Sequence, residues 1–479
     1  MEKQFEIAEV SSHGMIGSTD QEMTNEMERR VLRKIDMVVL PLMCLVFFSQ
    51  YLDKQSLSYA SVFGLIEDLR LDSFQFSWLG SMFYIGQFVS EFPFIYLMSR
   101  LPLVRFVGAT IIIWGGICMC LAASTTFSSF VGVRFALGFA EGAVSPAFVT
   151  ITSIWYKKEE HPFRIGLWIS CNGLAQVLGA LFMYGIGKMD VSMEAWKIMF
   201  LVCGALTSVL GIIFLVLMPT GPETAWFLTP DERRCARERL QTEADGGDQT
   251  EFSIYQLREA AADIRSYLNL FFGILITLPA PVIAFASLLI ENLGYGKFDT
   301  MLYTCPSGAV QIFFIWVGLF FCHLWPHRRC AITIGLTIVP LTGTILLFSL
   351  PLTAGWGMII ASWLASVISN IFTILLSLSA SNVRGNTKKA IVNALFFVGY
   401  SAGAVVGPLL WKNENAPRYY DGLVLALVSW VVLIAAVTFY WYTCYSENKK
   451  RVTSDAGDSS DQLGRDPTDK QNKAFRYST

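Results

Sequence analysis

The stretch Val133–Pro146, VRFALGFAEGAVSP, places an arginine and a glutamate inside a long apolar segment, Phe127–Tyr156. Arg134 and Glu141 are seven positions apart, so two helical turns bring both side chains to nearly the same face of a helix. The glycine and alanine residues between them allow a neighbouring helix or a ligand to come close. Because a charge in hydrocarbon is costly, such a pair indicates a functional site within a membrane. A purely structural tie between helices is the alternative interpretation.

The composition is that of a membrane protein. Of the 479 residues, 53% are hydrophobic and 15% are charged, whereas about 25% are charged in soluble proteins. The net charge of −2 provides no basic face for nucleic acid. The 10 cysteines form no CxxC pair and the 4 histidines lie at no ligand spacing, so we expect no metal or other cofactor. The first 35 residues contain no apolar core, which predicts the absence of a cleavable signal peptide.

Twelve apolar segments are each close to the ~20 residues that a helix needs to cross a bilayer. They are Met37–Gly64, Phe76–Met98, Phe106–Ala123, Phe127–Tyr156, Ile165–Gly187, Trp196–Met218, Tyr267–Ile290, Thr300–Phe321, Ala331–Leu350, Trp356–Ser379, Ala390–Trp411 and Gly422–Tyr445. We therefore predict an all-α membrane protein with twelve transmembrane helices in two six-helix bundles.

Polar segments divide the chain into five parts. We expect an N-terminal tail (1–35), a first bundle (36–218), a central loop (219–264), a second bundle (265–445) and a tail (446–479). The loop contains TPDERRCARERL, whose Thr-Pro-Asp-Glu start and alternating charges predict a surface helix. The tail is rich in Asp, Ser, Lys and Gln, which predicts disorder.

Basic residues in the loops predict the orientation. With the N-terminus inside, the cytosolic segments hold about 23 Lys and Arg residues and the outer loops about six. We therefore expect a multi-pass membrane protein with both termini in the cytosol. The fold needs no partner chain, so a monomer suffices.

Three further ionisable residues lie within the first two apolar segments. Asp53 and Lys54 are about 22 Å from the cytosolic start of the first segment. Adjacent residues point about 100° apart, so these two cannot simply neutralise each other, and each needs another partner or a wet cavity. Alternatively, the pair marks the outer interface. Glu91 either carries a proton or pairs with a basic residue at the cytosolic end, Arg100 or Arg105, both of which are candidates for a cytosolic gate.

Polar residues at mid-depth form the remaining candidate site. Asn172 and Gln176 lie one turn apart on the fifth helix, a spacing that suits either recognition of a carboxylate or contact between helices. The second bundle contributes uncharged polar residues to the same candidate site: Gln311, Asn370, Asn393 and Tyr400. Helix packing is the alternative for each. Pro279 and Pro281 interrupt the seventh segment, which is tolerable where the backbone lines a cavity. Arg384 and Lys388 lie at the cytosolic end of the eleventh segment. The positive-inside pattern is the first explanation for these two basic residues, and a cytosolic gate is the second.

Several of these motifs together resemble the allantoate permease family, the fungal anion:cation symporters of the major facilitator superfamily. The motifs are LDKQSLSYASVFG, RFALGFAEGAVSP, WYKKEEHPFRIGLW…NGLAQ, GPETAWFLTPDER, LYTCPSGAVQ, SNVRGNTKKAIVNALFFVGYSAGAVVGP and APRYYDG, within about residues 29–446. The resemblance implies the major facilitator fold, with a site between two halves. It also implies proton-coupled uptake of small organic anions or vitamins, and the plasma membrane as location. The loop SRLPLVRFVG lacks the superfamily's common G-x-L-x-D-R form, so a cytosolic gate would use other partners.

The intramembrane charges all lie in the first half, which suggests a division of labour. We expect Arg134 to pair with a substrate carboxylate and Glu141 to exchange a proton that regulates Arg134. Asp53 and Glu91 are further candidates for proton coupling. Lys54 is a candidate for gating. The second half would supply shape and amide contacts. The expected partners are a small organic anion, protons and the lipid bilayer.

Other functions stay open at this stage. A proton-coupled exporter of a metabolite would use the same residues, because the direction of transport cannot be read from them. A nutrient sensor on this scaffold usually adds a long cytosolic domain, and the tail of about 34 residues is short for one. An enzyme would need a nucleophile with a base or a metal cluster, and the four histidines are not paired.

Overall fold

A computed structural model describes residues 2–157, 160–189, 192–241, 253–292, 294–411, 419–453, 467–472 and 475–479, and every regular element in these ranges is a helix. The first half contains α1 (Glu2–Val62), α2 (Leu65–Asp68), α3 (Ser73–Arg100), α4 (Leu103–Leu121), α5 (Phe127–Glu141), α6 (Val144–Trp155), α7 (His161–Gly187) and α8 (Ala195–Leu217). The prediction of an all-α protein is confirmed.

The second half repeats this organisation after a linker. The linker holds η1 (Pro222–Thr224), α9 (Pro230–Gln241) and α10 (Ile254–Ala261). The second bundle contains α11 (Ile264–Thr277), α12 (Pro281–Asn292), α13 (Lys297–Leu324), α14 (Arg329–Ser349), η2 (Leu352–Ala354), α15 (Trp356–Ala365), α16 (Ser369–Asn382), α17 (Asn386–Leu409) and α18 (Tyr420–Thr453).

Ten segments of the described chain are long and apolar enough to cross a membrane. Three of them are broken into helix pairs: α5 with α6, α11 with α12, and α15 with α16. The break between α11 and α12 falls at Pro279 and Pro281, where the sequence predicts it, because proline lacks the N–H that would continue the ladder. Of the other two predicted spans, Met37–Gly64 is helical up to the end of α1 at Val62, and Phe76–Met98 lies within α3.

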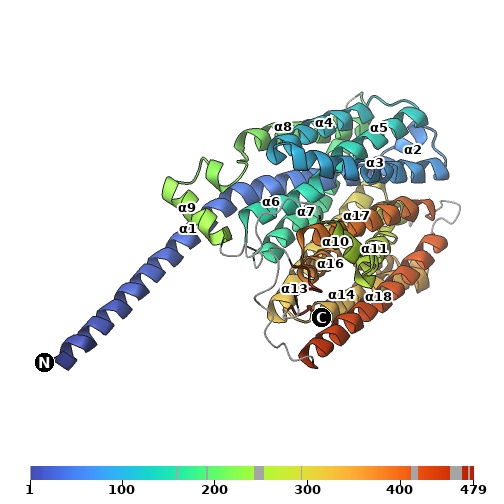
Figure 1. The fold of residues 1–479 in the computed structure, drawn as a ribbon. Coiled ribbons are helices and arrows are strands. Elements are labelled where there is room, and N and C mark those ends of the chain that lie inside the picture. Colours follow the sequence, from blue (N-terminus) through green and yellow to red (C-terminus); the bar gives the residue numbers. More distant parts are fainter. Residues whose placement is uncertain are drawn as a thin grey trace.

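The two bundles lie side by side (Figure 1), the first above the second in that view. Within the first bundle, α4 packs on α8, α3 packs on α5 and α1 packs on α7. Two helix pairs cross the interface between the bundles: α7 packs along α13, and α3 packs along α17. Two glycines allow the α7–α13 contact: a Cβ on Gly173 would lie 2.5 Å from the carbonyl oxygen of Gly308, and one on Gly308 would lie 2.3 Å from that of Gly173. Small residues thus bring the halves together.

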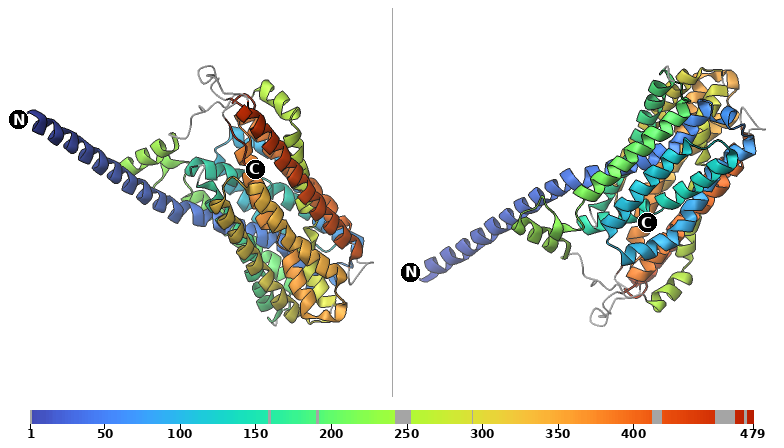
Figure 2. Two further views of the ribbon diagram at one scale, coloured as in Figure 1. Left: turned by 90° about the horizontal axis from the view of Figure 1, so that it is seen from below. Right: turned by 90° about the horizontal axis from the view of Figure 1, so that it is seen from above.

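The linker helices lie at one end of the bundles, which we call the terminal face; the opposite end is the far face. Here α1 projects well beyond the helix bundles (Figure 2). The predicted surface helix is confirmed as α9, which is fixed to α1 by an ion pair of 2.8 Å between Lys34 and Glu232. At the same face Arg164 at the start of α7 pairs with Asp36 of α1 at 3.0 Å.

The predicted disordered tail is wrong for the residues that the structure describes beyond 445. Helix α18 continues to Thr453, and Asp469 and Tyr477 are buried, at 1% and 4% exposure. Composition alone favoured disorder here because the partners of these residues lie on distant segments of the second bundle. Residues 454–466 of the tail are outside the described ranges.

Candidate functional site

A cavity of about 90 Å³ lies between the two halves. Its walls come from α1, α3 and α5 of the first half and from the α11–α12 region and α17 of the second. The lining residues include Lys54, Phe83, Tyr84 and Arg134 from the first half, and Thr277, Phe285 and Pro408 from the second. This volume accommodates several water molecules or part of a small solute.

Lys54 and Glu141 form an ion pair at this cavity. Lys54 Nζ lies 3.1 Å from Glu141 Oε1, and the side chain of Glu141 is fully buried while that of Lys54 is 18% exposed. Helix α5 also packs closely on α3 beside the cavity, since a Cβ on Gly138 would lie 1.8 Å from the carbonyl oxygen of Phe83. Neither carboxylate oxygen of Glu141 has a well-aligned hydrogen-bond donor in the described structure.

Arg134 lines the same cavity without a carboxylate partner. Its Nε donates to the carbonyl oxygen of Leu79 at 3.3 Å, and its Nη1 has no hydrogen-bond partner among the described residues. The structural tie between Arg134 and Glu141, which was the alternative interpretation of the sequence, is not an ion pair in the described structure, where Glu141 pairs with Lys54. Lys54 lies on α1 and Glu141 on α5, so the pair depends on tertiary packing, which a single-helix pattern cannot show.

The cationic groups of Arg134 and Lys54 both lie over one aromatic ring. The guanidinium carbon of Arg134 lies 5.3 Å, and Lys54 Nζ 5.6 Å, from the centroid of the Phe83 ring. Such contacts attract a cation to the face of a ring, more strongly where water is excluded. The site thus carries two positive charges and one negative charge, an excess of one positive charge.

Asp53 points away from the cavity, into the first bundle. Its carboxylate accepts hydrogen bonds from Trp114 Nε1 at 2.6 Å and from Thr207 Oγ1 at 3.1 Å, which belong to α4 and α8. Asp53 and Lys54 therefore have separate partners, which confirms the expectation from their adjacency. The contacts of Asp53 tie α1 to two neighbouring helices.

Gln176 and Gln311 join the halves at the α7–α13 contact. Gln311 Nε2 donates to Gln176 Oε1 at 3.2 Å, and Gln176 Nε2 donates to Ser307 Oγ at 2.7 Å. Gln311 Nε2 also donates to the carbonyl oxygen of Ser366 at 2.9 Å, at the break between α15 and α16. These amides have protein partners, so the structure favours the packing alternative for both.

Four other amides each have a buried polar atom without a partner among the described residues: Gln50 Nε2, Gln87 Oε1, Asn172 Oδ1 and Asn370 Nδ2. Because a buried polar atom without a partner is costly, the atoms of Gln87, Asn172 and Asn370 are candidates to contact water or a solute. Gln50 instead interacts with the carboxylate of Glu141. The sequence prediction included Asn172 and Asn370 but missed Gln50 and Gln87. Asn172 was selected because it lies one turn from Gln176 on the fifth helix, and Gln50 and Gln87 were not selected on that ground.

None of Asn172, Asn370, Asn393 and Tyr400 is among the residues that line the cavity, although Tyr400 is close enough to Lys54 and Glu141 for electrostatic interaction. Asn393 accepts a hydrogen bond from Ser379 Oγ at 3.4 Å, and the ring of Tyr400 lies 5.6 Å from that of Phe372. Glu91 is 6% exposed. The structure shows no ion pair between Glu91 and either Arg100 or Arg105 in the ranges it describes, so the expected structural pairing is not formed. Arg100 instead lies over the ring of Tyr96, 5.7 Å from its centroid, and Arg105 is exposed.

Arg384 and Lys388 lie at the terminal face of the second half. Arg384 contacts the ring of Phe475 at 5.2 Å. Lys388 is buried among Glu259, Asp263 and Asp469 at 2.7–3.1 Å. These partners belong to the linker, the start of the second bundle and the tail, and among the described residues Lys388 has no ion pair with the first half.

Comparison with known proteins agrees with this architecture. The Major Facilitator Superfamily profile matches residues 43–408. The chain is 34% identical to an uncharacterized transporter of Schizosaccharomyces pombe over 95% of this chain and 90% of that one. It is 29% identical to an allantoate permease and 28% identical to a thiamine pathway transporter, both of Saccharomyces cerevisiae, over 95% of this chain and 87% of each relative.

A solved structure shares the fold. A bacterial homologue of the human lysosomal transporter Spinster superposes with a TM-score of 0.61 at 16% identity, over 84% of this chain and 96% of that one. The helices, the interface cavity and the matched profile lead to one conclusion. The chain belongs to the major facilitator superfamily and is a multi-pass membrane transporter, not an enzyme.

Proposed function

We propose that this transporter carries a small organic anion together with a proton, by symport into the cytosol. The observation that carries the proposal is the Lys54–Glu141 ion pair beside Arg134 at the cavity between the halves. The excess of one positive charge suits an anion with a single charge. A guanidinium and an ammonium are the groups that proteins use to bind carboxylates.

The ion pair suggests how a proton couples to the anion. When Glu141 takes up a proton, its carboxylate becomes neutral and releases Lys54 Nζ. Lys54 and Arg134 then both face the cavity and pair with the substrate carboxylate. When the proton leaves on the other side, Glu141 reclaims Lys54 and the anion loses one partner. The cycle moves one proton with one negative charge and needs only a difference in affinity between two conformations.

This mechanism revises the roles expected from sequence. Glu141 keeps its place as the proton-exchanging residue, but the cation that it regulates is Lys54 and not Arg134. Asp53 is hydrogen-bonded to Trp114 and Thr207 within the first bundle and is not among the residues that line the cavity, so we do not include it in proton coupling. Asn172 and Asn370 remain proposed substrate contacts because each has a buried polar atom without a described partner.

Contacts at the far side of the cavity support alternating access. Ser81 Oγ donates to the carbonyl oxygen of Val405 at 2.8 Å, and the rings of Phe76 and Phe285 lie 6.0 Å apart. Each contact joins the two halves and lies toward the far face. Separation of these contacts would open the cavity on that side. We place the terminal face in the cytosol because of the basic residues in its loops, and we propose the plasma membrane as location.

The names of the relatives support the class of substrate only in part. One relative is named an allantoate permease and another a thiamine pathway transporter, so the names do not agree on one compound. Allantoate is a carboxylate, which fits the charges at the cavity. We propose membership of the allantoate permease branch on that basis and on the motifs in both halves.

Uptake of a panel of radiolabelled carboxylates into cells that overproduce the transporter tests this function. We expect at least one monocarboxylate to accumulate, faster at acidic than at neutral external pH. Arg134→Gln should abolish that uptake while the protein still reaches the membrane. Export that quickens as the outside is acidified would identify a proton antiporter instead, and a panel without any transported anion would contradict the proposal.

A further inference from the structure

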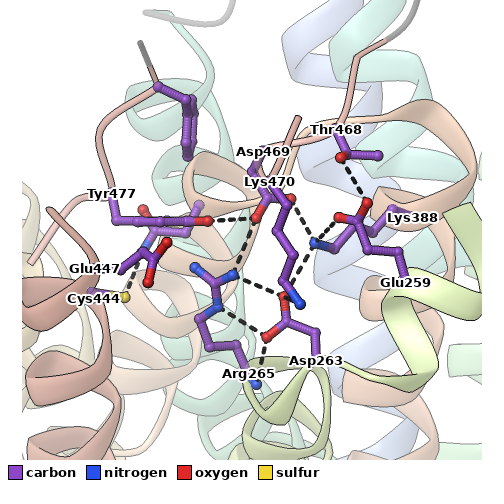
Figure 3. Close-up of polar contacts among 12 residues, drawn as sticks. Glu259, Asp263, Arg265, Lys388, Cys444, Glu447, Thr468, Asp469, Lys470 and Tyr477 are labelled. Atoms are coloured by element: carbon purple, nitrogen blue, oxygen red, sulfur yellow. Dashed lines mark hydrogen bonds and ion pairs between the residues drawn. The ribbon is translucent and has the colours of Figure 1, made fainter. Parts of the chain in front are cut away.

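The described end of the chain packs on the terminal face of the second half (Figure 3). Asp469 is the centre of this contact. Its Oδ1 lies 2.7 Å from Lys388 Nζ and its Oδ2 lies 3.3 Å from Arg265 Nη2. Asp469 and Lys388 are each 1% exposed. A buried ion pair of this kind depends on both partners, because removal of one leaves the other charge without compensation.

Tyr477 adds a second contact, eight residues further along. Its ring is flanked by two guanidinium groups, with Arg265 at 4.1 Å and Arg451 at 4.7 Å from the ring centroid. Its hydroxyl donates to Asp469 Oδ2 at 2.7 Å. Burial raises the pKa of the Tyr477 hydroxyl above its ordinary value, so the hydroxyl keeps the proton that it donates.

Arg451 fixes the backbone of the same segment from the end of α18. Its Nη2 donates to the carbonyl oxygen of Asp469 at 2.9 Å, and its Nη1 donates to that of Phe475 at 2.7 Å. Contacts with backbone oxygens hold the path of the segment as well as its side chains. The segment is therefore anchored to α11, α17 and α18 together.

The last residues reach two further connections of the second bundle. Ser478 N donates to Asn382 Oδ1 at 2.7 Å, and Asn382 Nδ2 donates back to the carbonyl oxygen of Ser478 at 2.9 Å. Thr479 N donates to the carbonyl oxygen of His327 at 3.1 Å. These bonds link the segment to the end of α16 and to the α13–α14 connection.

The linker helix α10 joins the same cluster. Glu259 accepts from Lys388 Nζ at 2.8 Å and from Thr468 Oγ1 at 2.8 Å, so one carboxylate connects α10, α17 and the tail. Gln256 of α10 accepts from the backbone N–H of Lys388 at 3.1 Å. Gly385, just before α17, has a φ of 91°, which favours glycine, and a Cβ there would lie 2.8 Å from Gln256 Oε1.

We propose that the described residues between 467 and 479 form a strap that docks on the terminal face of the second half. The strap fastens α10 and the terminal ends of α11, α16, α17 and α18 to one another. In transporters of this fold the two halves move against each other. The strap makes these parts of the second half move as one body, with Asp469 on Lys388 as its main anchor.

Trypsin cleavage of the full-length protein in native membrane vesicles tests whether the strap is docked. Lys470 and Arg476 supply cleavage sites inside it. We expect Asp469→Asn to speed release of the strap peptides about tenfold, because cleavage follows the population of the undocked state. Lys470→Arg keeps the cleavage site at a side chain that is 41% exposed, and should cleave at the wild-type rate.

A second measurement separates docking from general misfolding. Asp469→Asn and Lys388→Met should each lower the thermal stability, and the double variant should lose less than the sum of the two. Tyr477→Phe should speed cleavage to a smaller degree than Asp469→Asn. Cleavage of Asp469→Asn within twofold of wild type, or additive losses of stability, would overturn the strap.

Discussion

Lys54 Nζ lies 3.1 Å from Glu141 Oε1, and this ion pair joins α1 to α5 at the wall of the cavity between the halves. Lys54 and Arg134 lie over the same aromatic ring, that of Phe83. A proton on Glu141 changes which group Lys54 can bind. The pair is therefore the point at which proton binding and anion binding meet.

Lys54→Met tests the energetics of the pair. The substitution leaves the carboxylate of Glu141 buried without its partner, which we expect to cost about 3–5 kcal/mol of stability. The double variant Lys54→Met/Glu141→Gln removes both charges and should recover most of the loss. Thermal unfolding of the purified proteins measures this. Equal losses in the single and double variants would show that the pair is not coupled.

Asn172 and Gln176 lie one turn apart on α7, but substitution of each by leucine should affect stability and substrate affinity differently. Gln176→Leu removes bonds between the halves, so we expect a loss of about 1–3 kcal/mol in stability. Asn172→Leu breaks no described hydrogen bond of Oδ1, so it should change stability little and reduce substrate affinity. Thermal unfolding and KM for uptake, measured on both variants, distinguish them. A larger loss of stability in Asn172→Leu would contradict the assignment.

The α7–α13 contact predicts a difference between two glycines of the same helix. Gly173→Ala places a Cβ 2.5 Å from the carbonyl oxygen of Gly308 and should force the halves apart. Gly185→Ala has nothing within 4 Å of its Cβ and serves as the control. We expect Gly173→Ala to abolish transport and lower stability, while Gly185→Ala keeps wild-type uptake. Uptake and expression at the membrane check both.

Asp263, at the start of α11, predicts how the terminal face responds to acid. Burial alone would raise its pKa, but the hydrogen bond from Arg265 and the charges of Arg265, Lys388 and Lys470 outweigh burial and hold the pKa below its ordinary value. Its contribution to stability is thus full above the unfolded pKa of about 3.9 and is lost as pH falls through the folded value.

The corresponding experiment compares thermal stability in wild type and Asp263→Asn across pH. The difference between the two should be largest near neutral pH and shrink below about pH 4. Glu447→Gln, whose carboxylate is 40% exposed, is the control and should show a small difference throughout. A difference that grows as pH falls would contradict the sign of the shift.

Local patterns predicted most of the helices. Runs of apolar residues identified the spans, Pro279 and Pro281 identified the break between α11 and α12, and Arg134 with Glu141 identified the charged helix at the cavity. Such features depend on the chemistry of neighbouring residues. The structure retains them because a bilayer leaves the backbone few alternatives to a helix.

The partners of the charges could not be predicted in the same way. Asp53 binds Trp114 and Thr207, which lie 61 and 154 positions away, and Lys54 of α1 pairs with Glu141 of α5. A sequence shows which residues need a partner, but packing selects the partner. The prediction of a disordered tail was wrong for the same reason. Asp469 and Tyr477 belong to a segment of polar composition, but basic residues of three helices bury them.

Accumulation of the transported carboxylate in proteoliposomes, driven by an inward proton gradient, tests the central claim most directly. Wild type should concentrate the anion, with one proton entering per anion and no net charge movement. Glu141→Gln should fail to concentrate it yet still exchange internal for external anion, since Lys54 and Arg134 remain available. Full gradient-driven accumulation by Glu141→Gln would contradict the account.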